Sequence, residues 1–351
     1  KINPRSGELP DEFIYIDLES VKKGYLIKET QINKIGAPSR AQRLLNKNDV
    51  IFQTVRPYQK NNYFFNLDGD YVASTGYAQL RVLNSPEFLY QALHTDRFVY
   101  DVMARSTGTS YPAINSTDLS KIKLNLPTKP EQTKIAAFLT AVDNKIELLH
   151  QKQELLGEYK KGLMQQIFSQ AIRFKADDGS DFPDWEEKKL GSLCEITTGK
   201  LDANAMVKDG QYRFYTCAKE YYKIDDYAFD TDALIVSGNG ANVGYIHHYQ
   251  GKFNAYQRTY VLDSFTDNIV FVKFVLDGYL HKRIMKEKNE GNTPYIVMGT
   301  LTDMKINLPS FSEQTKISNF LSSIDSKIEQ VSKQLDESKQ FKKALLQQMF
   351  V

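Results

Sequence analysis

Apolar residues recur at alternating spacings of four and three in two stretches of the chain, one near its middle and one at its end. The first series is Ile135, Leu139, Val142, Ile146, Leu149, Leu156, Leu163 and Ile167, and the second is Ile317, Leu321, Ile324, Ile328, Val331, Leu335, Leu345 and Met349. A period of about 3.5 residues is typical of a helix whose apolar stripe packs against another helix. The pattern therefore predicts two long helices of the coiled-coil type.

The two helical stretches are copies of one another. Residues 126–168 align without a gap with residues 308–350, at an offset of 182, and 19 of the 43 pairs are identical. Each copy opens with a capping-box signal, Thr128-x-x-Glu131 or Ser310-x-x-Glu313, so we expect a helix to begin at each. A lone helix would leave its apolar stripe in water. We expect the two helices to pair antiparallel, and packing of each on another protein is the alternative.

Polar residues interrupt both apolar series at a few positions. They are Gln153 and Lys160 in the first copy, and Ser338 and Lys342 in the second. Polar residues at such positions commonly fix the register of paired helices. Lys160 and Lys342 are equivalent under the offset of 182.

Two stretches of a different pattern precede the helices. Short β-rich runs, such as 49–55 and 233–237, alternate there with polar turns and with helical pieces at 86–104 and 268–288. We predict a first module at 1–127, a helix at 128–171, a polar linker at 172–185, a second module at 186–309 and a second helix at 310–351. The modules match poorly except where 123–127 parallels 305–309, so two unlike modules are attached to two similar helices.

Composition narrows the class of protein. The 351 residues are 41% hydrophobic and 12% aromatic, which is enough for folded cores, while a net charge of +2 does not by itself predict nucleic-acid binding. There is no apolar run of about 18 residues and no signal-peptide pattern after Lys1, so we expect no membrane association and a cytoplasmic protein. The two cysteines, Cys194 and Cys217, predict neither a disulfide framework nor a metal site.

The repeated motif resembles that of a known family. Asn-Leu-Pro, Glu-Gln-x-Lys-Ile, Phe-Leu, Asp and Lys-Ile-Glu occur in this order in both copies, from Asn125 and from Asn307. This pattern is similar to the specificity subunit of type I restriction-modification enzymes, and the resemblance covers nearly the whole chain. The segments 54–58, 185–191 and 237–240 are also similar to that family. One departure is that Trp185–Gly191 has no counterpart ahead of Lys1, so we expect the first module to be incomplete at its N-terminus.

The resemblance implies a fold and a function. The fold would be α+β, with two mixed α/β target-recognition domains separated by two long antiparallel coiled-coil helices in a pseudo-two-fold repeat. Each domain would read one half of a bipartite site in double-stranded DNA. The helices would set the spacing and dock two adenine-N6 methyltransferase subunits, and two restriction-translocase subunits would complete the complex. The chain would not be an enzyme, and S-adenosylmethionine, ATP and Mg would belong to its partners.

The candidate DNA-binding residues are those whose side chains suit base edges. Arg and Lys pair with guanine, and Asn and Gln pair with adenine. In the first module they are Arg56, Tyr58, Gln59, Lys60, Asn61, Asn62, Thr109, Ser110 and Tyr111. In the second they are Ser237, Asn239, Asn242, Tyr256, Gln257, Arg258 and Asn292, with Lys200 and Lys219 as weaker choices. Any of them could instead contact a phosphate or hold its loop, because half or more of protein–DNA hydrogen bonds go to the DNA backbone.

No catalytic residues are predicted. Asn292–Tyr295 resembles the Asn-Pro-Pro-Tyr loop of amino-methyltransferases, but its second position differs and no S-adenosylmethionine loop precedes it. His247 and His248 are expected at exposed loop positions. Three other functions stay open: a coiled-coil adaptor that binds proteins, a methylating enzyme in its own right, and the specificity subunit of a type IIB-like enzyme.

Overall fold

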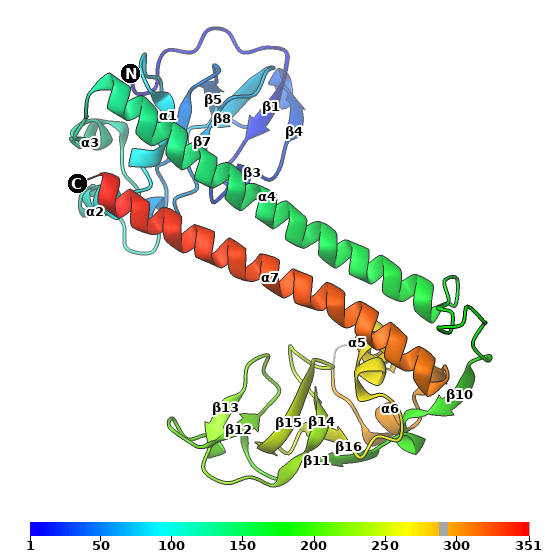
Figure 1. Ribbon diagram of the computed structural model, residues 1–351. Helices are drawn as coiled ribbons and strands as arrows, with labels where there is room; N and C mark the ends of the chain where they lie inside the picture. Colours follow the sequence, from blue (N-terminus) through cyan, green and yellow to red (C-terminus); the bar gives the residue numbers. More distant parts are fainter. Residues whose placement is uncertain (288–293, 351) are drawn as a thin grey trace. The chain divides into compact units, whose positions relative to one another are not determined.

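The computed structural model describes residues 1–287 and 294–350, and it divides into two compact units (Figure 1). Unit 1 consists of Lys1–Lys152 and Val331–Val351, and unit 2 consists of Gln153–Gln330. Two long helices, α4 (Lys129–Phe168) and α7 (Phe311–Met349), contribute a stretch to each unit. Each unit therefore combines one module with part of both helices, which confirms the predicted α+β repeat.

Both long helices begin where the sequence predicted, directly after Thr128 and Ser310. The Ser310 hydroxyl accepts a hydrogen bond from the backbone N–H of Glu313 at 3.4 Å, which is the expected half of a capping box. The other half of the predicted capping box, a hydrogen bond from the Ser310 backbone N–H to the Glu313 carboxylate, is wrong for this helix. The Glu313 carboxylate accepts hydrogen bonds from Arg173 at 2.8 Å and from the Trp185 indole at 3.1 Å, because it is buried beneath the segment that follows α4.

The two helices lie side by side and run in opposite directions within unit 1 (Figure 1). The predicted seam residues form one apolar cluster there: Val142, Ile146, Leu149, Leu335 and Leu345. Lys342 of α7 pairs across the seam with Asp143 of α4 at 2.5 Å. Within unit 2 the equivalent pair forms in the opposite sense, from Lys160 of α4 to Asp325 of α7 at 2.6 Å. The two equivalent lysines of the seam thus form equivalent ion pairs, one in each unit.

The first module is built on two small sheets. The four-stranded sheet has the order β4-β1-β8-β5, with β1 at Glu12–Ile16, β4 at Thr30–Asn33, β5 at Ala41–Leu44 and β8 at Tyr71–Ser74. The three-stranded sheet has the order β7-β6-β9, with β6 at Val50–Gln53, β7 at Tyr63–Phe64 and β9 at Tyr77–Leu80. A hairpin of β2 (Val21–Lys22) and β3 (Tyr25–Leu26) and the 3-10 helices η1 (Lys34–Gly36) and η2 (Pro57–Gln59) complete this part.

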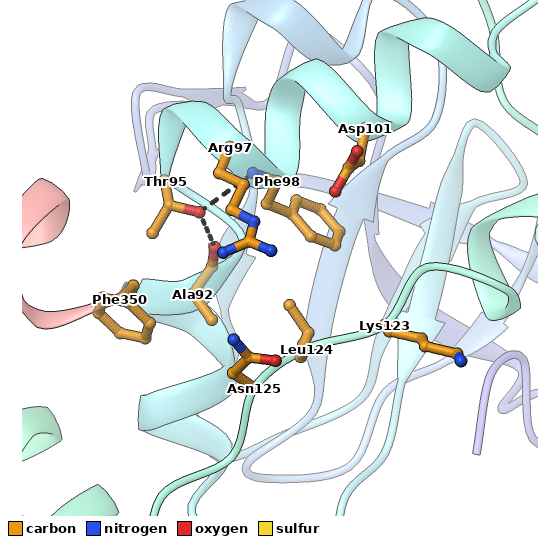
Figure 2. Close-up of a pocket in the computed structure, with 9 residues that line it drawn as sticks. All are labelled: Ala92, Thr95, Arg97, Phe98, Asp101, Lys123, Leu124, Asn125 and Phe350. Atoms are coloured by element: carbon orange, nitrogen blue, oxygen red, sulfur yellow. Dashed lines mark hydrogen bonds between the residues drawn. The ribbon is translucent and has the colours of Figure 1, made fainter.

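Helices α1 (Pro86–Ala92), α2 (Asp96–Arg105) and α3 (Ser116–Ser120) follow the sheets of the first module. The predicted helical piece 86–104 is therefore two helices. It is interrupted because the Thr95 hydroxyl accepts a hydrogen bond from the Phe98 N–H and starts a new helix (Figure 2). Phe98 also lines a cavity of about 40 Å³ with Leu124 and Phe350 (Figure 2), which leaves room for only a few water molecules.

The second module is built on one six-stranded sheet in the order β11-β16-β14-β15-β12-β13. The strands are β11 (Glu195–Thr198), β12 (Tyr212–Tyr215), β13 (Tyr222–Ile224), β14 (Phe229–Ser237), β15 (Ile246–Ala255) and β16 (Thr259–Asp263). Helices α5 (Ile269–Glu287) and α6 (Met298–Thr302) follow, with η3 (Leu190–Ser192) and η4 (Ala203–Ala205) near the start. The predicted strand at 233–237 is confirmed within β14, and the helix predicted at 268–288 is confirmed over the described residues Ile269–Glu287.

Alternation along β14 gives the second module a core on each face of its sheet. Leu234 and Val236 pack in the cluster that contains α5 and the helix seam, whereas Ala233 and Ile235 pack in a separate cluster on the opposite face. Buried on both faces, β14 is a rigid support for the loop that follows Ser237. Among the described residues, no helix is both long enough and apolar enough to cross a membrane.

The matching ends of the two modules differ in their pairing. In unit 2, β17 (Lys305–Leu308) pairs antiparallel with β10 (Glu186–Lys189). The equivalent residues 123–126 of unit 1 belong to no strand. As a result Leu126 is 66% exposed, whereas its counterpart Leu308 is 4% exposed.

Candidate nucleic-acid interface

The first candidate loop follows the buried strand β6 and is held in an unusual backbone conformation. Arg56 and Lys60 both have a left-handed backbone, with φ of 53° and 55°, on either side of η2. The backbone N–H of Gln59 donates to the carbonyl of Arg56, and that of Lys60 donates to the carbonyl of Pro57, both at 3.0 Å. A left-handed residue other than glycine costs about 1 kcal/mol or more, so this turn is maintained by its surroundings.

The structure brings the two candidate segments of the first module together at Arg56. Its guanidinium carbon lies 4.1 Å from the centre of the Tyr111 ring, and its backbone N–H donates to the carbonyl of Pro112 at 2.7 Å. The Tyr111 ring is 63% exposed, and Thr109 and Ser110 beside it are exposed as well. A guanidinium stacked on an exposed ring keeps its donors near the surface with restricted freedom.

The other polar residues of this loop divide into exposed and supporting groups. Tyr58 and Gln59 are exposed, whereas Asn62 is fully buried and accepts a hydrogen bond from the Gln53 backbone N–H at 3.0 Å. Asn61 accepts a hydrogen bond from the backbone N–H of Lys23 at 2.9 Å. Asn61 and Asn62 therefore hold the loop in place from its inner side.

The candidate segments of the second module also meet, at the end of β14. The backbone N–H of Gly238 donates to the carbonyl of Arg258 at 2.9 Å, and a Cβ atom on Gly238 would lie 2.2 Å from that oxygen. Only glycine permits this approach. Asn239 forms an isolated bridge with Tyr295, and the Asn242 side chain donates to the Cys217 carbonyl at 3.1 Å. The loop after β14 is thereby joined to three other segments of the module.

The remaining candidates of the second module vary in exposure. Gln257 and Arg258 are exposed, and the Gln257 amide donates to Asp202 at 3.1 Å. Tyr256 is half-buried and Ser237 is fully buried. Lys200 and Lys219 are exposed. Asn292 lies outside the described residues.

The second module also contains an aromatic cluster that the sequence analysis did not select. The guanidinium of Arg213 lies between the rings of Tyr221 and Tyr249, 4.3 Å and 4.2 Å from their centres, and donates to the Tyr215 hydroxyl at 3.3 Å. The dense tyrosines of 212–222 were the available signal, but their contact with Arg213 depends on pairing between distant strands. This arrangement gives the guanidinium a fixed orientation.

The histidine pair was assigned wrongly to an exposed loop. His247 and His248 lie on strand β15, where one faces inward and the other outward. His247 forms a hydrogen bond with the Ala218 carbonyl at 3.0 Å, and burial lowers its pKa. His248 contacts Asp232 of the neighbouring strand at 2.8 Å. His247 thus contacts the segment between β12 and β13, and His248 contacts the neighbouring strand β14.

Comparison with known proteins identifies the family. A family model described as the type I restriction modification DNA specificity domain matches residues 11–158 and again residues 183–338. The chain belongs to this family. It is 42% identical over 168 residues to the type I restriction enzyme EcoDI specificity subunit of Escherichia coli, an alignment that covers 46% of this chain and 37% of that protein.

More distant members of the specificity-subunit family match longer stretches. The MjaVIII specificity subunit of Methanocaldococcus jannaschii is 25% identical over 274 residues, covering 69% of this chain and 64% of that protein. The HindI specificity subunit of Haemophilus influenzae is 26% identical over 215 residues, covering 58% and 44%. The chain therefore spans less than two thirds of the length of these three curated relatives.

Solved structures share the fold of this family member. The S subunit of a type I restriction-modification system from M. genitalium aligns with a TM-score of 0.68 at 19% identity, over 100% of this chain and 93% of that chain. A chain from a structural study of type I R-M complex assembly and conformational transition aligns with a TM-score of 0.57 at 22% identity, over 99% and 92%. Both likenesses concern the fold.

The two specificity domains of the chain share one arrangement of backbone hydrogen bonds between their loops. This arrangement identifies a segment of the first domain that the sequence analysis did not select. In the second domain Gly238 donates to Arg258; in the first, the Thr54 N–H donates to the Gly76 carbonyl at 3.0 Å. The turn before β9 is thus the positional counterpart of the candidate turn before β16. The Thr75 N–H beside it donates to the carbonyl of Arg40, whose side chain is exposed. Arg40 and Thr75 do not lie in a segment rich in side chains suited to base edges, so only this backbone pairing identified them.

The chemistry available at these loops of the specificity domains is hydrogen bonding and positive charge. Within residues 1–287 and 294–350, no three His, Cys, Asp or Glu side chains are grouped so that they could hold a metal ion. Cys194 and Cys217 are free, and burial raises the pKa of the Cys194 thiol to about 12. The loops therefore offer cations, amides, hydroxyls and aromatic rings, which suit the recognition of a polyanion.

Proposed function

We propose that the chain is the DNA-reading subunit of a type I restriction-modification system, with each module reading one half of a bipartite site in double-stranded DNA. The observation that carries the proposal is the repeat. Two similar helix stretches each support a specificity domain. The surface loops of the two domains differ in sequence, although the helices that support them are alike. Such a construction suits the recognition of two different short sequences.

The side chains at the loops support direct reading of bases. An arginine such as Arg56 can bond both acceptors of guanine in the major groove, and an exposed amide such as Gln257 can bond adenine in the same way. Stacking on Tyr111 limits the freedom that Arg56 would lose on binding, which favours affinity. Arg258 is the counterpart choice in the second module because it is exposed on the turn that supports Gly238.

The proposal assigns the chemistry to partner subunits in the cytoplasm. Two adenine-N6 methyltransferase subunits would dock on the helices and supply S-adenosylmethionine, and two restriction-translocase subunits would supply ATP and Mg sites. This chain itself would be non-catalytic. Exposed apolar residues on α4, Leu148, Leu155 and Tyr159, are suitable contacts for such subunits, since they are 65%, 65% and 55% exposed.

Genome-wide mapping of adenine methylation tests the proposal. The chain is expressed with its methyltransferase subunit in a host that lacks adenine methylation, and the methylated positions are sequenced. We expect a single split motif that disappears when this chain is omitted. Methylation without a split motif, or methylation that persists without the chain, contradicts the proposal. A protein-binding adaptor would leave the genome unmethylated.

A second experiment tests whether the helices set the spacing of the half-sites. One heptad is inserted in α4 between Lys152 and Gln153 and another in α7 between Gln330 and Val331, where the two units meet in sequence. Seven residues add about 10 Å of helix, or roughly three base pairs of duplex. We expect a spacer lengthened by that amount with both half-sites unchanged. An unchanged spacer would mean that the helices do not set the distance.

A further inference from the structure

A basic cavity lies in unit 1 between the first candidate loop and helix α7. Its volume is about 520 Å³. Five of the side chains that line it are lysines: Lys23, Lys60, Lys339, Lys342 and Lys343. In the described part of the chain, Asp96 is the single carboxylate of its lining. The cavity therefore carries an excess of positive charge, in a chain whose net charge is only +2.

Two of the five lysines are already neutralised within the chain. Lys60 pairs with Asp96 at 2.8 Å, and Lys342 pairs with Asp143 across the helix seam. The hydrogen bond from Lys60 lowers the pKa of Asp96, which also accepts a hydrogen bond from Gln347 at 3.2 Å. The one acidic side chain of the cavity is thus hydrogen-bonded to Lys60 and Gln347, and it also attracts Lys343 without forming an ion pair with it.

The other three lysines carry the uncompensated charge. Lys23, Lys339 and Lys343 are exposed, and among the residues that the structure describes they form no ion pair. Lys339 and Lys343 are one turn apart on α7, so both side chains emerge on the same face of the helix. His94 in the cavity wall adds no charge at neutral pH, because burial and the nearby lysines lower its pKa to about 4.

We propose that this cavity binds a backbone phosphate of duplex DNA next to the half-site that the first module reads. The inference rests on the proposed function and extends it. Gln59 and Lys60 belong both to the candidate reading loop and to the cavity wall. A duplex whose base edges reach Arg56 therefore brings a phosphate to the lysines, and a compact ammonium group is suited to that anion.

The internal repeat indicates that the phosphate site belongs to one module. The counterparts of Lys342 and Lys343 under the 182-residue offset are Lys160 and Lys161, but the counterpart of Lys339 is Gly157. Lys160 pairs with Asp325 and lies 4.8 Å from the centre of the Phe274 ring. Lys160 is thus engaged in unit 2 as Lys342 is in unit 1, and the two units differ at Lys339, whose counterpart Gly157 has no charge.

Salt dependence of DNA binding measures the phosphate contact. The full chain, alone and with its methyltransferase subunit, is titrated onto a fluorescent random-sequence duplex at several NaCl concentrations. Each phosphate contact contributes about −0.9 to the slope of log K against log salt. For Lys339→Ala/Lys343→Ala we expect the slope to become shallower by roughly 1 to 2. Affinity should fall equally for all sequences, and the methylated motif should stay unchanged.

A matched control removes the same charge elsewhere. In Lys161→Ala/Lys333→Ala, Lys161 is the repeat counterpart of Lys343, and Lys333 lies on a different face of α7. This variant should keep the wild-type slope. All four positions are exposed and helical, and alanine has a high helix propensity. Both double variants should therefore fold as the wild type does, which circular dichroism checks.

Two results would overturn the assignment. One is a wild-type slope for Lys339→Ala/Lys343→Ala. The other is thermal stabilisation of the wild type, but not of this variant, by inorganic pyrophosphate while the DNA slope stays unchanged, because the cavity would then take a free phosphate compound. A missing split methylation motif would instead count against the proposed function, so the two failures are distinguishable.

Discussion

The ammonium group of Lys160 lies 2.6 Å from the carboxylate of Asp325, and the repeat places the same pair at Lys342 and Asp143. Each pair joins α4 to α7, and each lies in a different unit. Lys160 also contacts the ring of Phe274 in the second module. The pair therefore connects both helices and the module they support in unit 2.

Removing the Lys160 ammonium should weaken unit 2. Its side chain is 19% exposed and that of Asp325 is 45% exposed, so the pair is partly screened and we expect Lys160→Ala to cost about 1 kcal/mol of unfolding free energy. Lys161→Ala is the neighbouring control and should cost under about 0.5 kcal/mol. Urea denaturation measures both. A double-mutant cycle with Asp325→Ala that gave no coupling would contradict this role for the pair.

Glu313 and Glu131 occupy the same position of the repeat and should differ in importance. Glu313 is fully buried with Arg173 and Trp185, whereas Glu131 is exposed. Glu313→Ala removes the buried carboxylate that pairs with Arg173 and accepts from Trp185, so we expect a loss of about 3 kcal/mol. Glu131→Ala should change the unfolding free energy by less than about 0.5 kcal/mol. Thermal melts of the two variants measure the difference, and an equal loss of stability in both would refute the predicted asymmetry.

Arg56 and Arg258 should act on opposite half-sites. Arg56→Ala should relax specificity only in the half read by the first module, and Arg258→Ala only in the other half, each at roughly 1–3 kcal/mol. Tyr111→Ala should produce a smaller effect in the same half as Arg56→Ala, because the ring restrains the guanidinium. Methylation mapping reports all three. Both arginine variants altering one half-site would break the assignment.

The neutral state of His94 should make stability depend on pH. Burial lowers its pKa to about 4, whereas an unfolded histidine titrates near 6.5. Below about pH 6.5 the unfolded chain therefore binds a proton that the folded chain does not. Stability should fall as the pH decreases from 6.5 to 4 and should then level off. Urea midpoints from pH 7 to 4 measure this trend, and His94→Gln should flatten it. An equally steep trend in the variant would exclude His94 as its cause.

Much of the architecture could be predicted from the sequence because it depends on local and repeated patterns. The apolar spacing and the hydroxyl before each helix located α4 and α7, and compact β-rich runs bounded by polar turns located β6 and β14. The break between α1 and α2 was missed, because the Thr95 cap competes with a continuous apolar pattern. The placement of His247 and His248 was wrong because strand β15 carries polar residues along much of its length.

The candidate interface was predicted only in its outline. The stretches around Arg56 and Arg258 have suitable side chains, but the sequence does not distinguish an exposed amide such as Gln257 from the buried one of Asn62. The stacking of Arg213 on tyrosines and the place of Arg40 beside the turn before β9 both depend on contacts between segments distant in the sequence.

The sequence alone determined the repeat, the paired helices and the family resemblance, since helical periodicity and internal identity are properties of residue order. Only the tertiary structure decided which of two identical residues is buried, as with Glu313 and Glu131, and which lysines stay unpaired around a cavity. The physical reason is that burial and ion pairing depend on what packs against a side chain. In this protein those neighbours come from segments more than a hundred residues away, such as Arg173 against Glu313.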